Sequence, residues 1–556
     1  MPRDGSDTVQ GVSGLEDAWI TGYDYTLAFD ARYVAIGAGS PFGGVPNPLA
    51  NPLVGVGSLQ DFLDYARAKG SFRFIPDITT PLNYVDGCYL LEPMKDDGRG
   101  LTQRLDWTQR LKIRNPTTDL GLALRGLLFE AAGGMDITQP LAGTFVRAAP
   151  SVTYHDANGF VKTVGANVLR NGHFPGPATP GGARTGPCIL LESARTNSCL
   201  QSETLDNASW TKTRLTVSAN GLLSPDGVNV TADKLVEDTS VTTTHTITQD
   251  ITITSGETVA VSGYFRPGGR YRARLQFADS TTTNGFRVDF DLIAGTVVNA
   301  GNIGAGVLAG TDLEYLANGW VRVLAWGQVN GAVTAGRLFL LLEDNTGNPT
   351  YTGDGASALW AWGLQVERCS TNTGAAPTSY LATTTTTVTR VGDTATAFTF
   401  PLGAPIQSMT VYAKIVDLSP VTAAVTPFGI AQIGDTGFTQ PRWYITKSSN
   451  TWSSVLGNEI GQTSSGTTAA LSSAYGDVVE FVAQLDASNP GSVLVKLFTS
   501  TNGAAPSQNS GTSILLPASW HAALVALGPF MNSGAFGILR YKIAAGVKDF
   551  ATMQAA

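Results

Sequence analysis

Hydrophobic and polar positions alternate along most of the chain with the two-residue period of β-strands. In segment 285–292 (GFRVDFDL) the apolar residues Phe286, Val288 and Phe290 alternate with charged ones. The segment 359–367 (LWAWGLQVE) predicts a strand with one apolar face, formed by Trp360, Trp362, Leu364 and Val366. Because side chains of a strand point alternately to its two faces, these patterns indicate half-buried strands.

The first 135 residues show a mixed pattern. Residues 19–34 (WITGYDYTLAFDARYV) predict one long half-buried strand. Residues 58–70 (SLQDFLDYARAKG) predict a helix, which Ser58 caps at its start and Gly70 ends. We therefore expect an N-terminal β-sandwich with one α-helix over residues 1–135.

Residues 136–188 contain many glycines and prolines and predict an irregular linker. Residues 189–393 and 394–556 each contain a succession of short alternating strands, which is typical of two-sheet sandwiches. A Thr-rich connector at 381–395 separates them, and a short helical turn is expected near the C-terminus. The fold class is therefore mainly β, with two antiparallel β-sandwiches after the N-terminal unit.

Composition excludes several kinds of protein. The chain has 556 residues, 14% of them charged, and a formal net charge of −8, so we expect no nucleic-acid partner. No apolar run approaches the ~18 residues of a membrane span, so we expect no membrane insertion. The polar start of the chain, MPRDGSD, predicts no secretory signal.

Motifs of catalysis are missing from the sequence. It contains no GxSxG elbow, no GxxxxGK[ST] phosphate loop and no HExxH. Its four histidines are scattered singly. Asp289 and Asp291, on one strand face, meet the carboxylate requirement of glycoside cleavage, and Asp96/Asp97 would meet it with a partner elsewhere in the chain. Alternating acidic residues opposite an apolar face are also typical of a solvated strand face. We predict a protein that is not an enzyme.

Aromatic residues near turns and strand ends are candidates for stacking on sugar rings. Those beside turns in the middle unit are Trp210, Tyr264, Trp320 and Tyr351. In the last unit Arg442, Trp443 and Trp452 cluster in the same way. The alternative for each is ordinary packing in a core, where aromatic residues usually lie.

Three aspartates lie in Asp/Gly-type turns where oxygen ligands converge in calcium sites. They are Asp226, Asp233 and Asp354. A structural calcium ion is one interpretation. The other is that each aspartate bonds the backbone of its own turn, as Asp does in most such turns. No other cofactor is predicted.

Five separated segments resemble a module of tailed-bacteriophage structural proteins. They are GTFVRAAPSVTYHDANGFVKTVGANVLR, ILLESARTNSCLQSETLDNASWTK, PDGVNVTADKLVED, GNPTYTGDGASALWAWGLQVE and APTSYLATTTTTVTR. The resemblance covers about residues 143–393, and it implies a jelly-roll sandwich similar to carbohydrate-binding modules, carried on a virion fibre, spike or tail protein. Cys199 and the Pro/Gly insertion at 175–187 depart from the pattern.

Two weaker resemblances concern the ends of the chain. FGILRYKIAAGVKDF is similar to the final segment of concanavalin A-like lectin sandwiches. The helix at 58–70, followed by FRFIPD and a strand with a tryptophan, resembles the tail-tube and distal-tail family of siphophages. That resemblance implies that residues 1–135 anchor the chain to the particle.

Together these observations predict a minor tail or tail-tip protein of the virion, assembled in the host cytoplasm. Its partners would be other tail proteins, copies of itself in a ring or trimer, and a host surface glycan bound through several weak sites. Three alternatives stay open: a head fibre or decoration protein of the capsid, a purely structural tail component, and a depolymerase that cuts polysaccharide.

Overall fold

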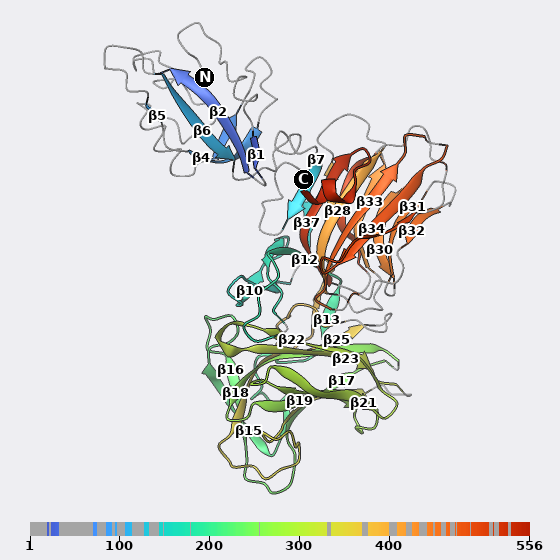
Figure 1. Ribbon diagram of the computed structural model, residues 1–556. Coiled ribbons are helices and arrows are strands. Elements are labelled where there is room, and N and C mark those ends of the chain that lie inside the picture. Colours follow the sequence, from blue (N-terminus) through green and yellow to red (C-terminus); the bar gives the residue numbers. More distant parts are fainter. Residues whose placement is uncertain are drawn as a thin grey trace.

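The protein is described from a computed structural model. The described residues are strands within 19–132 and most of 144–555. The gaps after residue 144 are 148–149, 178, 255, 331–334, 370–375, 400–407, 419–424, 433–441, 449–450, 458–462, 468–472, 474, 490, 511–514, 516–521 and 532–534. The fold is mainly β with antiparallel sheets that pack as sandwiches, as the sequence predicts (Figure 1).

The first unit contains one sheet in the order β1-β2-β6-β4-β3, with β5 beside β6. Its strands are β1 (Trp19–Thr21), β2 (Asp24–Arg32), β3 (Ser71–Phe74), β4 (Val85–Leu91), β5 (Lys95–Asp96) and β6 (Asp106–Ile113). The single long strand predicted over 19–34 is wrong, because β1 and β2 pair antiparallel with Thr21 opposite Asp24. The helix predicted at 58–70 lies outside the described residues, as does Asp97.

A two-sheet sandwich, called here the C-terminal sandwich, is assembled from segments far apart in the sequence. Its sheet III has the order β11-β12-β37-β28-β33-β34-β35, with β7 beside β37, and its sheet IV has the order β32-β31-β30-β29-β36-β27-β8. Ile189 and Leu191 from β12 belong to the same buried core as Ile538 and Ile543 from β37.

Sheet III consists of β7 (Leu127–Ala132), β11 (Arg170–His173), β12 (Cys188–Glu192), β28 (Met409–Asp417), β33 (Val478–Asp486), β34 (Leu494–Thr501), β35 (Ser507–Ser510) and β37 (Ala535–Ala545). Sheet IV consists of β8 (Thr144–Val146), β27 (Thr394–Thr399), β29 (Val425–Gln432), β30 (Arg442–Ser448), β31 (Thr451–Gly457), β32 (Thr463–Thr467) and β36 (Ala522–Met531). The short helix α4 (Phe550–Ala555) follows, at the place where a helical turn was expected.

The segment 136–188, predicted to be an irregular linker, therefore contains strands of this sandwich. β8 pairs with β27 and β11 pairs with β12, while β9 (Val152–His155) and β10 (Val161–Val164) form a separate hairpin. Glycine and proline are dense here because the strands are three or four residues long and the turns between them are frequent. The expected boundary near 189 also falls inside the C-terminal sandwich.

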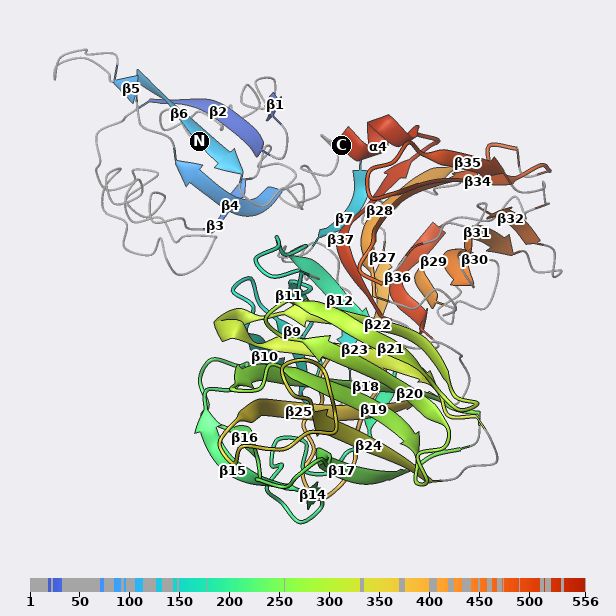
Figure 2. The same ribbon diagram turned by 60° about the horizontal axis from the view of Figure 1, so that its bottom comes forward.

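The remaining strands form a sandwich inserted between β12 and β27, called here the inserted sandwich. Its sheet I has the order β15-β16-β25-β18-β23-β22, and β13 pairs with β25 and with β26 outside this order. Its sheet II has the order β14-β17-β24-β19-β20-β21 (Figure 2). One apolar core lies between the two sheets, and Phe286, Val288 and Phe290 point into it as predicted.

Sheet I consists of β13 (Arg195–Asn197), β15 (Leu215–Leu222), β16 (Ala232–Glu237), β18 (Thr258–Gly268), β22 (Val307–Tyr315), β23 (Val321–Gln328), β25 (Ala358–Cys369) and β26 (Val388–Arg390), with the 3-10 turn η2 (Ala317–Gly319) before β23. Sheet II consists of β14 (Thr211–Thr213), β17 (His245–Thr252), β19 (Arg272–Asp279), β20 (Gly285–Asp291), β21 (Thr296–Ile303) and β24 (Ala335–Leu342).

A bulge in β25 corrects the predicted face of that strand. Leu364 and Val366 point into the core between the sheets, but Trp360 and Trp362 lie on the opposite, outer face of sheet I. Gly363 between them has a φ of +64°, and the register with β18 shifts at this point. A glycine in the left-handed region adds a residue to the strand, so the alternation of the side chains changes phase.

The outer face of sheet I is largely covered. Tyr264, Trp320 and Trp362 pack there in a second apolar cluster with Val161 of β10 and with Tyr380. Tyr380 belongs to the segment between β25 and β26, which is called here the connector. Farther along the face, Leu324 and Trp326 pack with Tyr475, which belongs to the C-terminal sandwich. The two sandwiches are therefore in direct contact through this face of sheet I. Among the described residues, no helix has the length and apolar content required to cross a lipid bilayer.

Candidate functional site

The aromatic residues predicted to contact sugar are core residues instead. The relative exposures of Trp210, Tyr264, Trp320, Tyr351, Trp443 and Trp452 range from 0% to 7%. The indole N–H groups of Trp210 and Trp320 donate to the carbonyl oxygens of Gln201 and Leu223, at 3.0 and 3.1 Å. Position near a turn did not imply exposure, because neighbouring segments fold over these side chains. The side chain of Arg442 lies outside the described residues.

The aspartates predicted to bind calcium do not converge. Asp226 accepts hydrogen bonds from the backbone N–H groups of Val228 and Asn229 within its own turn. Asp354 accepts from Ala356 and Ser357, and these hydrogen bonds, Ser357 first, lower the pKa of its carboxyl group. In the part of the chain that the structure describes, no three His, Cys, Asp or Glu side chains gather as metal ligands.

Asp233, the third predicted ligand, is buried on β16. Its carboxylate accepts from the backbone N–H groups of Leu205 and Asn220, at 2.6 and 2.9 Å. It thereby holds the loop after β13 against β15. The interpretation in which each aspartate bonds the backbone of its own turn holds for Asp226 and Asp354. It is wrong for Asp233, whose backbone partners belong to distant segments.

A buried cluster of ionic side chains joins the two sandwiches and is called here the junction cluster. It consists of Arg147, Arg170, Glu192, Arg390 and Asp393, all with exposures between 0% and 2%. Arg170 of β11 pairs with both Glu192 and Asp393, and Arg390 of β26 pairs with Glu192 at 2.9 Å. Because β11 belongs to sheet III and β26 to sheet I, the cluster links the two sandwiches.

The connector after β25 is bound to the same cluster. Glu192 accepts hydrogen bonds from the N–H and the hydroxyl group of Ser379, each at 2.6 Å. Burial acts to raise the pKa of Glu192, but Arg170, Arg390 and Ser379 outweigh it, so this pKa is lowered and the residue is ionised. A buried carboxylate with this many donors is a structural anchor rather than an accessible catalytic group.

The sequence motifs that resemble phage proteins map onto this architecture. In LLESARTN, Glu192 belongs to the junction cluster and Asn197 accepts from the N–H groups of Cys199 and Val366. In WGLQVE, Gln365 accepts from Leu381 N–H and Glu367 accepts from Thr378 N–H. These motif residues hold the connector and the sandwiches together.

The outer face of sheet II has a different composition and is called here the polar face. Strand register places its side chains in rows that cross the sheet. One row contains Thr211, Thr248, Phe339, Gln276 and Arg287. The next contains Thr213, Thr246, Leu341, Arg274, Asp289 and Asn299. Hydroxyl, amide, guanidinium and carboxylate groups thus surround a half-buried aromatic ring.

Most charges on the polar face are paired with a neighbour. Asp289 accepts from Arg274 at 2.6 Å, from Arg287 at 3.0 Å and from Asn299 at 3.1 Å. Asp291 lies 3.2 Å from Arg272. The expected solvated strand surface is therefore a network of ion pairs on β19 and β20, to which β21 adds the hydrogen bond of Asn299. Such pairs fix the positions of donors and acceptors that point away from the core.

Glu343, just after β24, is the exception within this network. It is fully buried, and its carboxylate makes no hydrogen bond within the described residues, although Arg274 lies 3.4 Å away. Burial raises the pKa of Glu343 to about 7, and the neighbouring Asp289 adds to the rise. The sequence did not mark this residue, because its position relative to β19 and β20 depends on strand pairing.

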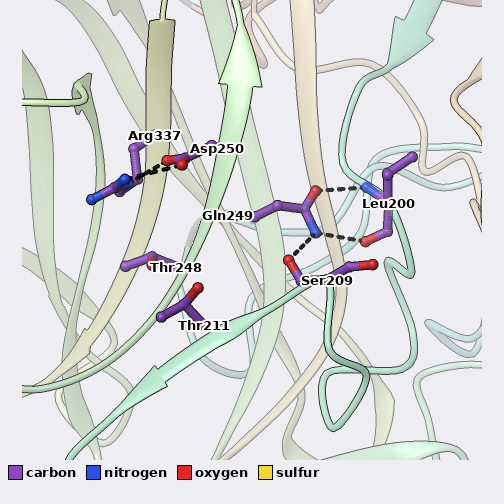
Figure 3. Close-up of a pocket in the computed structure, with 7 residues that line it drawn as sticks. All are labelled: Leu200, Ser209, Thr211, Thr248, Gln249, Asp250 and Arg337. Carbon is purple, nitrogen blue, oxygen red and sulfur yellow. Dashed lines mark hydrogen bonds and ion pairs between the residues drawn. The ribbon is translucent and has the colours of Figure 1, made fainter.

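A cavity of about 310 Å³ opens at the β14 end of the polar face (Figure 3). It is lined by Leu200, Ser209, Thr211, Thr248, Gln249, Asp250 and Arg337. In Figure 3 the Asp250–Arg337 pair lies on the same side of β17 as Thr248, whereas the Gln249 amide points the other way, toward Leu200 and Ser209. Gln249 is held by Leu200, whose N–H donates at 2.7 Å and whose carbonyl accepts at 2.9 Å. This polar lining suits a ligand rich in hydroxyl groups.

Comparisons with known proteins leave the family of this chain open. No protein-family model matches the sequence, and no curated protein matches it. Among solved structures, mouse laminin alpha1 chain domains LG4-5 are similar over 66% of this chain and 92% of that chain, with 11% identity and a TM-score of 0.19. The N-terminal CBM22-1-CBM22-2 tandem domain of Paenibacillus barcinonensis Xyn10C is similar over 64% of this chain and 98% of that chain, also with 11% identity and a TM-score of 0.19. At these TM-scores neither structure informs the function of this chain.

Proposed function

We propose that this chain is a non-enzymatic adhesion protein of a tailed-bacteriophage particle, and that the polar face of its inserted sandwich binds a glycan of the host surface. The polar face carries the proposal. It combines a half-buried Phe339 ring with fixed hydroxyl, amide and charged groups and continues into a polar cavity. A sugar ring requires an apolar surface for its C–H face and hydrogen-bonding groups around its rim.

The virion assignment is supported by the motif resemblance of residues 143–393. Because the motif residues form the junction between two sandwiches, the resemblance concerns an architecture rather than a ligand site. In the proposal, residues 1–135 anchor the chain to tail proteins, and copies of the chain assemble as a ring or trimer. Several weak sites then act together and raise the overall affinity.

The proposal is tested with the purified full chain on an array of bacterial surface glycans. We expect binding to at least one glycan, and about tenfold or more weaker binding by Phe339→Ala, because a central aromatic contact is typically worth over ~1.4 kcal/mol. Ile293→Ala is the matched control, since Ile293 is 65% exposed in the turn between β20 and β21. Absence of binding to every host envelope fraction would contradict the proposal.

A purely structural virion component is the second candidate. It is favoured by the burial of Trp210, Tyr264 and Trp320, which leaves the predicted sugar contacts inside the protein. The position of the chain in an intact particle separates the two functions. If the polar face is covered by a neighbouring subunit there, the structural function holds. An exposed polar face favours adhesion.

A further inference from the structure

One part of the outer face of sheet I stays partly exposed. Cross-strand pairing places Lys234 of β16, Trp360 of β25 and Arg266 of β18 side by side in one row. All three side chains are partly exposed, although Trp362 and Tyr264 in the adjacent row are buried. The bulge at Gly363 is what brings Trp360 to this face. This row is called here the Trp360 site.

The indole of Trp360 lies against backbone on both sides of its strand. A Cβ atom added to Gly221 would approach Cη2 of Trp360 to 2.7 Å, and one added to Gly268 would approach Cδ1 to 3.1 Å. The two glycines therefore provide the space in which the ring lies. In the described part of the chain the indole N–H groups of Trp320 and Trp362 donate to Leu223 and Thr231, whereas that of Trp360 has no hydrogen-bond partner there. A ring held in this way presents a fixed apolar surface beside a free donor.

The two cations beside the ring are not neutralised. Nζ of Lys234 lies 5.8 Å from the centroid of the Trp360 ring. Within the described residues, neither Lys234 nor Arg266 has a carboxylate within 4.0 Å. The other arginines of the inserted sandwich mostly pair with a carboxylate, as do Arg270, Arg272, Arg274, Arg287, Arg322, Arg337, Arg368 and Arg390. In a chain with a net charge of −8, two adjacent unpaired cations are a local positive spot.

We infer that the Trp360 site binds an acidic saccharide unit, one that carries a carboxylate or a phosphate group. The apolar face of the sugar would stack on the indole, the fork of Arg266 would take the anionic group, and Lys234 would add a point charge. A nucleic acid is disfavoured, because its phosphate backbone requires a longer basic surface than two side chains. The inference deepens the proposed function and adds a site on the sheet opposite the polar face.

The experiment measures binding of the full chain to an oligogalacturonate by calorimetry, with the methyl-esterified oligosaccharide as neutral counterpart and a phosphorylated oligosaccharide as the second acidic probe. We expect the acidic forms to bind and the ester to bind at least about tenfold more weakly, since charge-assisted hydrogen bonds are lost. Whichever acidic form binds more tightly identifies the anionic group. Binding of the acidic form should also weaken as salt is added.

Two variants test whether the acidic oligosaccharide binds at the Trp360 site. The double variant Lys234→Gln/Arg266→Gln keeps the side chains long and should lose about tenfold or more of the affinity. Trp360→Ala should lose a similar factor, and its melting temperature shows whether it folds. The control is Lys496→Gln/Lys548→Gln, which removes the same charge from the C-terminal sandwich and should bind normally.

The outcomes separate this inference from the proposed function. If neutral glycans bind and acidic ones do not, or if the Lys234/Arg266 variant binds the acidic oligosaccharide unchanged, the inference is wrong and the proposed function stands. If no saccharide binds, both are wrong. Tighter binding of a single-stranded oligonucleotide than of either acidic oligosaccharide would assign the site to another ligand and overturn the inference.

Discussion

The junction cluster and the polar face are both built from ion pairs, but they differ in how deeply these pairs are buried. Both consist of arginines paired with carboxylates, but the side chains of the junction cluster are at most 2% exposed, whereas Arg274 and Arg287 on the polar face are 16% and 27% exposed. At the junction two arginines of different sheets bind one carboxylate, Glu192. The difference shows that the ion pairs of the motif-rich region lie inside the molecule, where they join two sheets, whereas those of the polar face lie partly exposed at its surface.

The strongest test of this comparison removes Glu192. Glu192→Ala should reduce the free energy of unfolding by about 3–5 kcal/mol, because Arg170 and Arg390 would remain buried without their shared carboxylate. Urea unfolding followed by tryptophan fluorescence measures the change. A loss below about 1 kcal/mol would mean that the junction behaves like an exposed ion pair, and the comparison would fail.

Glu343 provides a contrast to Glu192, because it is also a buried carboxylate but accepts no hydrogen bond within the described residues. Its pKa of about 7 in the folded protein exceeds the ordinary value of 4.5. The folded state therefore binds a proton more tightly, so its stability falls as the pH rises from about 4.5 to about 7 and stays lower above that. Glu343→Gln should remove this loss and gain about 1–3 kcal/mol over wild type at pH 8.

Unfolding of both proteins across this pH range provides the measurement. The difference between variant and wild type should vanish near pH 4, where the wild-type carboxyl is protonated in both states. A difference that is the same at all pH values would show that Glu343 acts through packing rather than through its charge.

The smallest effect is expected at the edge of the polar face. Asp250 and Arg337 pair at 3.0 Å, but their side chains are 66% and 32% exposed. A double-mutant cycle with Asp250→Ala and Arg337→Ala should give a coupling energy of about 0.2–1 kcal/mol, because water screens exposed charges. Coupling as large as the loss expected for Glu192→Ala would remove the distinction between the two regions.

The sequence predicted strands better than it predicted their partners. Alternation located β20 with its inward face, and it located β25, because period-2 patterning is a local property. It could not show that β12 pairs with β37, since those residues are more than 300 positions apart. The bulge at Gly363 also escaped it, because a glycine in a strand permits a bulge without requiring one.

The candidate site was harder to predict than the fold. Trp210 and Trp320 were chosen for their proximity to turns, but other segments cover them, and coverage is a tertiary property. Trp360 was predicted to share a face with Leu364 and Val366, yet the bulge places it on the outer face of sheet I, where it is partly exposed. Asp289 and Asp291 of the polar face were interpreted as part of a solvated strand surface. Only the pairing of β17, β24, β19 and β20 shows that the residues of this face form rows.

Because the inserted sandwich lies between β12 and β27 in the sequence, the order of synthesis on the ribosome affects how the chain folds. β12 emerges early, but its neighbour β37 is among the last strands to be synthesised. The inserted sandwich can fold before β37 is synthesised. Until then β12 lacks its partner, and its unpaired edge is prone to wrong pairing. A nascent chain that stalls before residue 535 would therefore carry one finished domain and one unfinished domain.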